Sequence, residues 1–167
     1  GTSADALTRA IQRVHERTQL LAAAVESTLA PPPARGSFTQ GLMRAAGRDW
    51  SEPFDQTLRA AQDPSPMQID ATRLMLIGST PPDERLHEAV ERSGANIVAT
   101  LNPATPHRLD SRANEGNAFD QIARRCRAHS WRAQLQSPEG FCDRASELRI
   151  AGVILWTVTE DAGLAWA

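Results

Sequence analysis

The sequence contains no lysine and no tyrosine, and all 18 of its basic residues are arginine. These absences exclude any mechanism that needs a Schiff-base lysine, a phosphate-loop lysine or a catalytic tyrosine. The nucleotide composition of the source genome explains such an arginine bias as readily as selection for guanidinium chemistry does. The bias alone therefore assigns no function.

Cysteine is almost as scarce, because the chain has only Cys126 and Cys142. Two cysteines are too few for a structural zinc site built from thiolates alone, and a disulfide is not expected in a cytosolic protein. Both are predicted to be buried thiols. His107 and His129 do not combine with either cysteine at a spacing typical of a metal motif.

The chain also lacks a long apolar run. No segment approaches the roughly 20 apolar residues of a membrane span, and no signal-peptide pattern opens the sequence. A net charge of −2 excludes the basic excess that nucleic-acid or anionic-membrane binding needs. With 41% hydrophobic residues in 167, the sequence predicts a cytoplasmic protein with a packed core, and no nucleic-acid or membrane partner.

The first part of the chain has the apolar spacing of helices. A helix is predicted over Ala4–Leu29, where Pro31-Pro32-Pro33 stops it, and shorter helices are predicted over Phe38–Ala46 and Ser51–Ala61. Gln62–Asp70 has the composition of a linker. We therefore expect a helical segment and linker over residues 1–70 and an α/β domain over 71–167.

The α/β pattern begins with the apolar run Leu74–Ile77, which ends at Gly78. Pro81-Pro82-Asp83 then opens a predicted helix, and a second strand is predicted at Asn96–Thr100. After a polar stretch come two more helical patterns and the apolar run Ile150–Val158. The predicted fold class is α/β, a small parallel three-layer Rossmann-like (flavodoxin-like) sheet preceded by a helical segment.

Several of these segments together resemble a known family. Their order resembles the later part of a D-component-like subunit of the 2-hydroxyacyl-CoA dehydratase and benzoyl-CoA reductase family. The family's Arg-strand-Gly-Ser-x-x-Pro-Asp pattern is matched by Arg73 and by the loop Gly78–Asp83. The matching later segments are Leu86–Gly94, Ile97–Ala99, Ile122–Arg125 and Ala151–Trp156.

The resemblance implies an iron-sulfur cluster held by cysteines at the carboxyl ends of the strands. Those cysteines would fall near Asn102-Pro103, His129–Trp131 and Glu160-Asp161, where this sequence has none. Cluster iron is held by thiolates, so no cofactor is expected from this chain, and a cluster is expected only where other parts or chains supply it. Because the family's subunits are longer, the resemblance implies a fragment or a shortened member.

Ligands of open α/β sheets bind beyond the carboxyl ends of the strands, so Gly78, Ser79, Thr80 and Asn102 are the predicted binding residues. Ser79 is the predicted catalytic or substrate-contacting residue. It is expected to hydrogen-bond the thioester or hydroxyl of an acyl group, or else to cap the next helix. A phosphate site at this loop would need backbone amides, and the two prolines that follow remove donors.

Other polar residues have two interpretations each. Arg124 and Arg125 are expected either to clamp the phosphates of coenzyme A or to form an exposed helix face. Glu160 and Asp161 are expected to contact a ligand or metal, or to form a solvated turn. His87, among charged neighbours on a helix, is predicted to be a surface residue.

These expectations lead to two hypotheses of function. The first is a cluster-free relative of the dehydratase subunits that acts as a structural or interaction component, or as an acyl-CoA-binding subunit, of a larger complex. The alternative is a catalytic hydro-lyase or reductase subunit acting on an acyl-CoA thioester. The expected partner is another subunit or a second copy, because the apolar face with Leu7, Ile11 and Val14 needs a cover.

Overall fold

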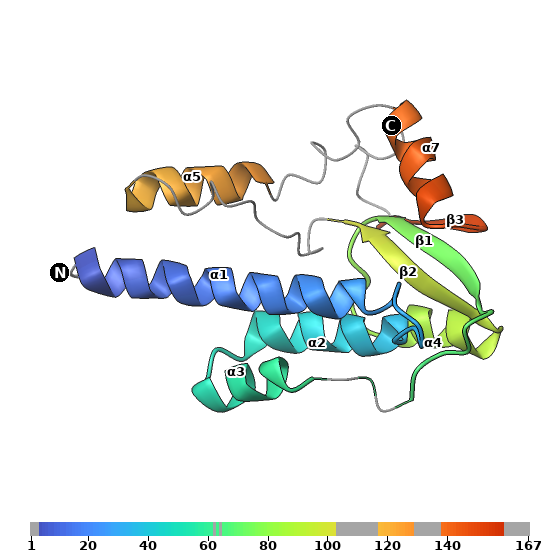
Figure 1. Cartoon of the computed structure of the whole chain (residues 1–167), viewed down its shortest axis with the longest axis horizontal. Coiled ribbons are helices and arrows are strands. Elements are labelled where there is room, and N and C mark those ends of the chain that lie inside the picture. Colours follow the sequence, from blue (N-terminus) through green and yellow to red (C-terminus); the bar gives the residue numbers. More distant parts are fainter. Residues whose placement is uncertain (1–3, 62, 64, 103–116, 129–137, 159–167) are drawn as a thin grey trace.

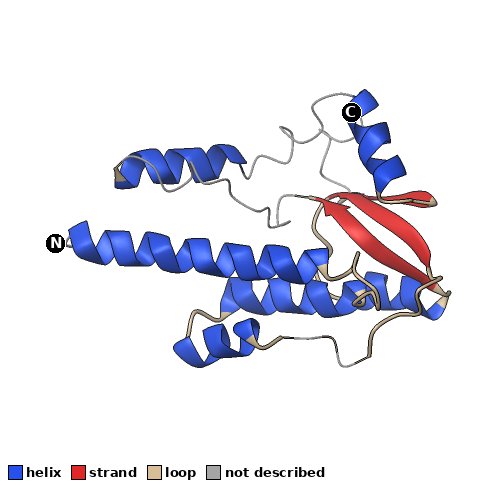
Figure 2. Ribbon diagram, viewed as in Figure 1, coloured by secondary structure: helices blue, strands red, loops and turns tan. Residues whose placement is uncertain are grey.

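Figures 1 and 2 show the computed structural model of the chain, which describes residues 4–61, 63, 65–102, 117–128 and 138–158. Three helices come first, then a strand, a helix and a strand, and finally two helices and a strand. The helices are α1 (Ala4–Glu26), α2 (Gly36–Arg48), α3 (Glu52–Arg59), α4 (Arg85–Arg92), α5 (Ala118–Ala128) and α7 (Pro138–Glu147), and the strands are β1 (Thr72–Gly78), β2 (Ala95–Leu101) and β3 (Gly152–Trp156). The predicted α/β class, with a helical segment first, is confirmed.

The three strands form one parallel sheet in the order β2-β1-β3. Two connections link the strands. The first runs from β1 through α4 to β2, and the second runs from β2 back across β1 to β3, in the opposite direction along the sheet. Because such crossovers are right-handed, they place α4 and α7 on opposite sides of the sheet, as Figure 1 shows. In sheets of this kind the carboxyl ends of the strands form a crevice open to ligands.

The core centres on β1, as expected for the middle strand of a parallel sheet. Met75 and Leu76 are 1% and 0% exposed, and Ile97 and Val98 of β2 are also buried. The edge strand β3 is different, because its residues alternate between half-buried and exposed. At Gly152–Trp156, β3 is also shorter than the predicted strand Ile150–Val158.

The helical segment packs directly onto the α/β part. Helix α2 contacts both α4 and β2. The buried Asn96 side chain of β2 accepts from the Gly36 amide at 2.9 Å and donates to the Ala34 carbonyl at 2.9 Å. Thr28 Oγ1 donates to the Val98 carbonyl at 2.9 Å. The connection between α1 and α2 thus belongs to the same core as β2.

Two helix ends differ from the predicted ones. Helix α1 ends at Glu26, and the turn that follows uses the Thr28 hydroxyl to reach β2. Helix α4 begins at Arg85 and not at Pro81, because the Asp83 carboxylate accepts the Arg85 amide at 3.1 Å and holds the residues before it in a turn. The predicted helix start at Ser51 is confirmed, since its hydroxyl accepts the Phe54 amide at 3.3 Å.

Helix α5 contacts α1, so part of the α1 surface is covered within the chain. Ile11 is buried and Val14 is 38% exposed, while Phe119 on α5 is 77% exposed. The covered part of α1 therefore does not require a second subunit. Among the described helices, none combines the length and apolar character needed to cross a bilayer.

Candidate binding edge of the sheet

The carboxyl ends of the three strands bring together the loop after β1 and the ends of its two neighbours. Ile77 pairs with Leu101, and Gly78 pairs with Trp156. Asn102, the residue after β2, therefore follows directly beside Gly78. We call Gly78, Ser79, Thr80, Asn102 and Trp156 the carboxyl edge.

The loop after β1 is attached to β3 by its backbone. Gly78 is buried and has a φ of 110°, a conformation that residues with a side chain rarely adopt. The Ser79 amide donates to the Trp156 carbonyl at 2.7 Å. Ser79 is half-buried and Thr80 is exposed, so both hydroxyl-bearing residues are reached from solvent. The sequence correctly predicted that these residues follow the strand.

Ser79 does not cap the next helix. The N-cap position of α4 is Glu84, and the Asp83 carboxylate accepts the Arg85 amide just before the helix. This finding overturns the interpretation of Ser79 as a capping serine. The loop is instead anchored from the helical segment, because the buried Gln40 of α2 donates from Nε2 to the Pro81 carbonyl at 3.3 Å.

Two further side chains complete the carboxyl edge. Asn102 is 2% exposed and is buried at the end of β2. The indole Nε1 of Trp156 is buried, and among the described residues it has no hydrogen-bond acceptor. An indole N–H donates only and prefers a partner when buried, so Trp156 offers an unused donor beside the loop. The sequence alone does not identify Trp156 as a site residue, because an aromatic residue in an apolar strand is typical of a core.

The remaining predicted site residues lie elsewhere or outside the described part. Arg124 is half-buried on α5, the helix that contacts α1. Arg125 also belongs to α5, but its side chain lies outside the described residues, as do Glu160 and Asp161. Cys142 on α7 is exposed, which corrects the expectation of a buried thiol.

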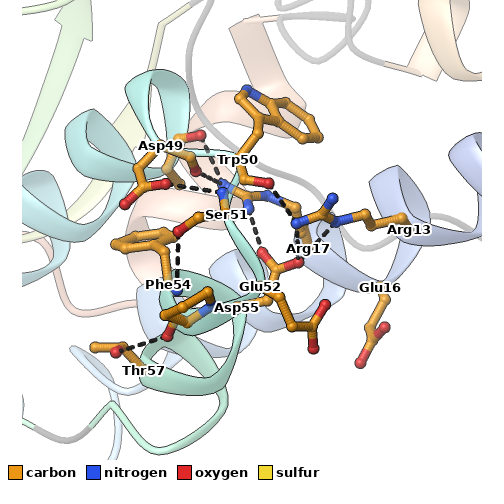
Figure 3. Close-up of polar contacts among 12 residues, drawn as sticks. Arg13, Glu16, Arg17, Asp49, Trp50, Ser51, Glu52, Phe54, Asp55 and Thr57 are labelled. Atoms are coloured by element: carbon orange, nitrogen blue, oxygen red, sulfur yellow. Dashed lines mark hydrogen bonds and ion pairs between the residues drawn. The ribbon is translucent and has the colours of Figure 1, made fainter.

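A second polar cluster joins α1, α2 and α3 (Figure 3). The buried Asp55 carboxylate accepts from Arg13 Nε at 2.7 Å and from Arg17 Nη1. Arg17 Nη2 donates to the carbonyls of Ala46 and Asp49 at 2.8 and 2.7 Å. The Arg17 guanidinium also lies 4.3 Å from the centre of the Trp50 ring. Its donors are thus directed at neighbouring helices.

The cluster controls the ionisation of Asp55. Burial alone would raise the pKa of this carboxyl, but the hydrogen bond from Arg13 and the charges of Arg17 and Arg13 more than offset that effect. The pKa of Asp55 is therefore below its ordinary value, and the group is ionised at neutral pH. Because Arg17 and Asp55 are both almost fully buried, this cluster is a structural junction.

A buried histidine lies where α2 meets α4. His87 is 2% exposed, which corrects its prediction as a surface residue. The reason is that α4 packs against both β2 and α2, so a second side of the helix is covered. Burial lowers the pKa of His87 to about 4, with the nearby Glu84 charge acting weakly against that shift. His87 is therefore neutral at physiological pH.

A separate pocket of about 310 Å³ lies between α1, α2 and α3. It is lined largely by apolar side chains, including Leu20, Phe38 and Leu58. None of the carboxyl-edge residues lines it. In the described ranges, no group of three or more histidine, cysteine or acidic side chains is placed to hold a metal ion.

No protein-family model matches the sequence, and neither the curated proteins nor the solved structures contain a significant match to this chain.

Proposed function

We propose that this chain is a binding component that holds the uncharged polar group of a small ligand at the carboxyl edge of its sheet. The observation that carries the proposal is the convergence of Ser79, Thr80, Asn102 and Trp156 at the ends of three parallel strands. This is the position at which open α/β sheets bind ligands. The proposed ligand class is an acyl thioester, such as an acyl-CoA.

The donors at the carboxyl edge favour a carbonyl or hydroxyl over a phosphate. The Ser79 amide is already bonded to Trp156, and Pro81 and Pro82 carry no N–H. Phosphate-binding loops instead direct several backbone amides at the anion. The hydroxyls of Ser79 and Thr80 and the indole N–H of Trp156 remain, and these suit an uncharged acceptor.

The same residues favour binding over catalysis. In the described part of the chain, the Ser79 hydroxyl has no hydrogen bond to a histidine or carboxylate that would act as its base. An unassisted serine is a weak nucleophile at neutral pH. Asp83, the acidic residue of this loop, is paired with Arg85 at 2.8 Å. These contacts support a ligand-holding role.

The resemblance to the acyl-CoA dehydratase and reductase subunits supports the choice of a thioester. It also supports a role within a larger assembly in which another chain carries out the chemistry. A cluster-free binding subunit reconciles this resemblance with the absence of cysteine at the three positions where cluster ligands would fall. The proposal thus needs no cofactor from this chain.

Calorimetric titration with a short-chain acyl-CoA, with the corresponding acyl-pantetheine and with unacylated coenzyme A tests the proposal. We expect both acyl compounds to bind and unacylated coenzyme A to bind more weakly. Ser79→Ala should lower the affinity for the acyl compounds about tenfold, the value of one hydrogen bond to a buried partner. Ser93→Ala is the matched control, because Ser93 is exposed at the opposite end of the strands.

Two results would count against the proposal. If the acyl compounds fail to bind at millimolar concentration, the proposed ligand class is refuted. If the wild type and S79A bind them with equal affinity, the carboxyl edge is refuted as the binding site. Mass spectrometry of the recovered acyl-CoA separates the two hypotheses of function. An unchanged thioester agrees with a binding component, whereas loss of water from a 2-hydroxyacyl thioester would show a hydro-lyase.

A further inference from the structure

The outer side of β3 presents unused backbone hydrogen-bonding groups. Within the described ranges, β3 pairs only with β1. The Trp156 carbonyl accepts the Ser79 amide, so the backbone of Trp156 faces the β1 side. Because the direction alternates along a strand, the backbone groups of Val153 and Leu155 face away from β1. These two residues therefore define the outer edge of β3.

This outer edge lacks the features that usually prevent strands from pairing. No charged residue and no proline occurs from Ile150 to Thr159. Exposed edge strands in natural proteins are usually interrupted by charges, prolines or bulges. Val153 and Leu155 are instead apolar, and they are 49% and 62% exposed.

The exposed side chains of β3 continue the apolar face of the sheet. Val153 pairs with Met75 and Leu155 pairs with Ile77, and residues paired in a parallel register point to the same face. Met75 is 1% exposed, whereas its neighbour on β3 is half exposed. Burial of this face thus stops between β1 and β3, which leaves an apolar strip along the outer edge.

We propose that β3 pairs antiparallel with β3 of a second copy of this chain, across a twofold axis at Ile154. In this register Ile154 lies opposite itself, Val153 lies opposite Leu155, and Gly152 lies opposite Trp156. Val153 and Leu155 then exchange both backbone hydrogen bonds, because both already face outward. The sheet continues through both copies.

The composition of β3 favours a second copy as the occupant. A twofold interface places the same surface on both sides, so a strand without charge meets no like-charge repulsion. The pairing is also compatible in size, because Trp156 lies opposite Gly152, which has no side chain to clash with it. Val153 and Leu155 cover each other on the other face. Each copy thus supplies the apolar surface that the other exposes.

The pairing leaves the Ser79–Thr80 loop of each copy accessible, and Trp156 is the carboxyl-edge residue that it places at the interface. Antiparallel pairing directs the carboxyl edges of the two copies in opposite directions, so neither Ser79 is covered by the other copy's loop. A five-residue strand gives a short ladder, so we expect a reversible dimer whose population rises with concentration. The dimer does not depend on ligand binding at the carboxyl edge.

Sedimentation equilibrium of the full chain tests the interface. We expect dimer at about 100 μM and monomer on dilution, and we expect Val153→Lys and Leu155→Lys each to raise the dissociation constant about 100-fold by placing a charge in the ladder. Both positions are exposed in the single copy, so the fold should persist, which circular dichroism checks. Ile69→Lys is the control, because Ile69 is 76% exposed and lies outside β3.

Disulfide formation tests the register. In a background with Cys126→Ser and Cys142→Ser, Ile154→Cys should cross-link two copies. Ile154 would form a non-hydrogen-bonded antiparallel pair with itself, and the opposed Cα atoms of such a pair are about 4.5 Å apart. Ala151→Cys should not, because it lies opposite Thr157. A monomer at every concentration, or a dimer unaffected by V153K, would overturn the interface. Equal cross-linking at positions 151 and 154 would overturn the register.

Discussion

Replacing Asp55 by asparagine should destabilise the helical segment strongly, because it leaves a buried cation without its counter-ion. Arg17 is 4% exposed and Asp55 is 3% exposed in their side chains, so water screens this pair little. Asparagine keeps the shape of the side chain but carries no charge. Its amide group would also direct donors at Arg13 or Arg17, both of which donate at this position.

The size of the expected loss of unfolding free energy follows from how deeply each of the two arginines is buried. Arg13 is 38% exposed and can turn toward solvent, whereas Arg17 is held by the carbonyls of Ala46 and Asp49 and by the Trp50 ring. Removing one partner of a buried pair costs about 3–5 kcal/mol. That is a large share of the 5–15 kcal/mol that typically stabilises a domain.

Urea unfolding followed by circular dichroism and tryptophan fluorescence measures the effect. D55N should lower the free energy of unfolding by about 3–5 kcal/mol, which corresponds to a fall in melting temperature of roughly 6–20 °C for a chain of this size. The control is Glu16→Gln, which removes the exposed partner of Arg59 and should cost less than about 1 kcal/mol. Equal losses in D55N and E16Q would refute the reasoning.

Two further predictions concern the junction between the helical segment and the sheet. The free energy of unfolding should fall by about 3 kcal/mol as the pH is lowered from about 6.5 to about 4. The reason is that the pKa of His87 is about 4 in the folded chain and about 6.5 in the unfolded chain, so the unfolded chain binds the proton first. Urea titrations at several pH values should show this loss in the wild type but not in His87→Gln, and identical pH profiles of the two proteins would contradict the prediction. Gly36→Ala should destabilise the chain by about 1–3 kcal/mol, because its Cβ would lie 2.8 Å from the Ile97 carbonyl oxygen. In the same helix, the Cβ of Gly47→Ala would meet no atom of the described residues within 4 Å, so this substitution should stabilise the chain by about 0.5–1 kcal/mol. Thermal melts that show the same sign for both alanines would contradict the packing argument.

Much of the fold was predictable because it depends on local patterns. The Ser51 cap marks the start of α3 through a contact within a few residues. The apolar run Leu74–Ile77 within β1 indicates a strand covered on both faces, and Met75 and Leu76 are indeed almost fully buried. Predictions failed where a boundary depends on a specific side-chain contact, such as Asp83 before α4.

The candidate site was only partly predictable. Gly78 ends a strand, and Ser79, Thr80 and Asn102 follow strands in the sequence. Parallel strands place such residues at one edge. Trp156 joins them through the register of β3 with β1, which no local pattern reveals.

The sequence by itself determined the order of helices and strands, the parallel sheet and the strand-end loop, because apolar periodicity and turn residues act over short distances. Only the tertiary structure decided which polar groups are buried together. Arg17 and Asp55 are 38 residues apart, and His87 meets Gly36 across two helices. Such pairings depend on how the helices pack. The physical reason is that the cost of burying a charge or an imidazole depends on neighbours that are distant in the sequence.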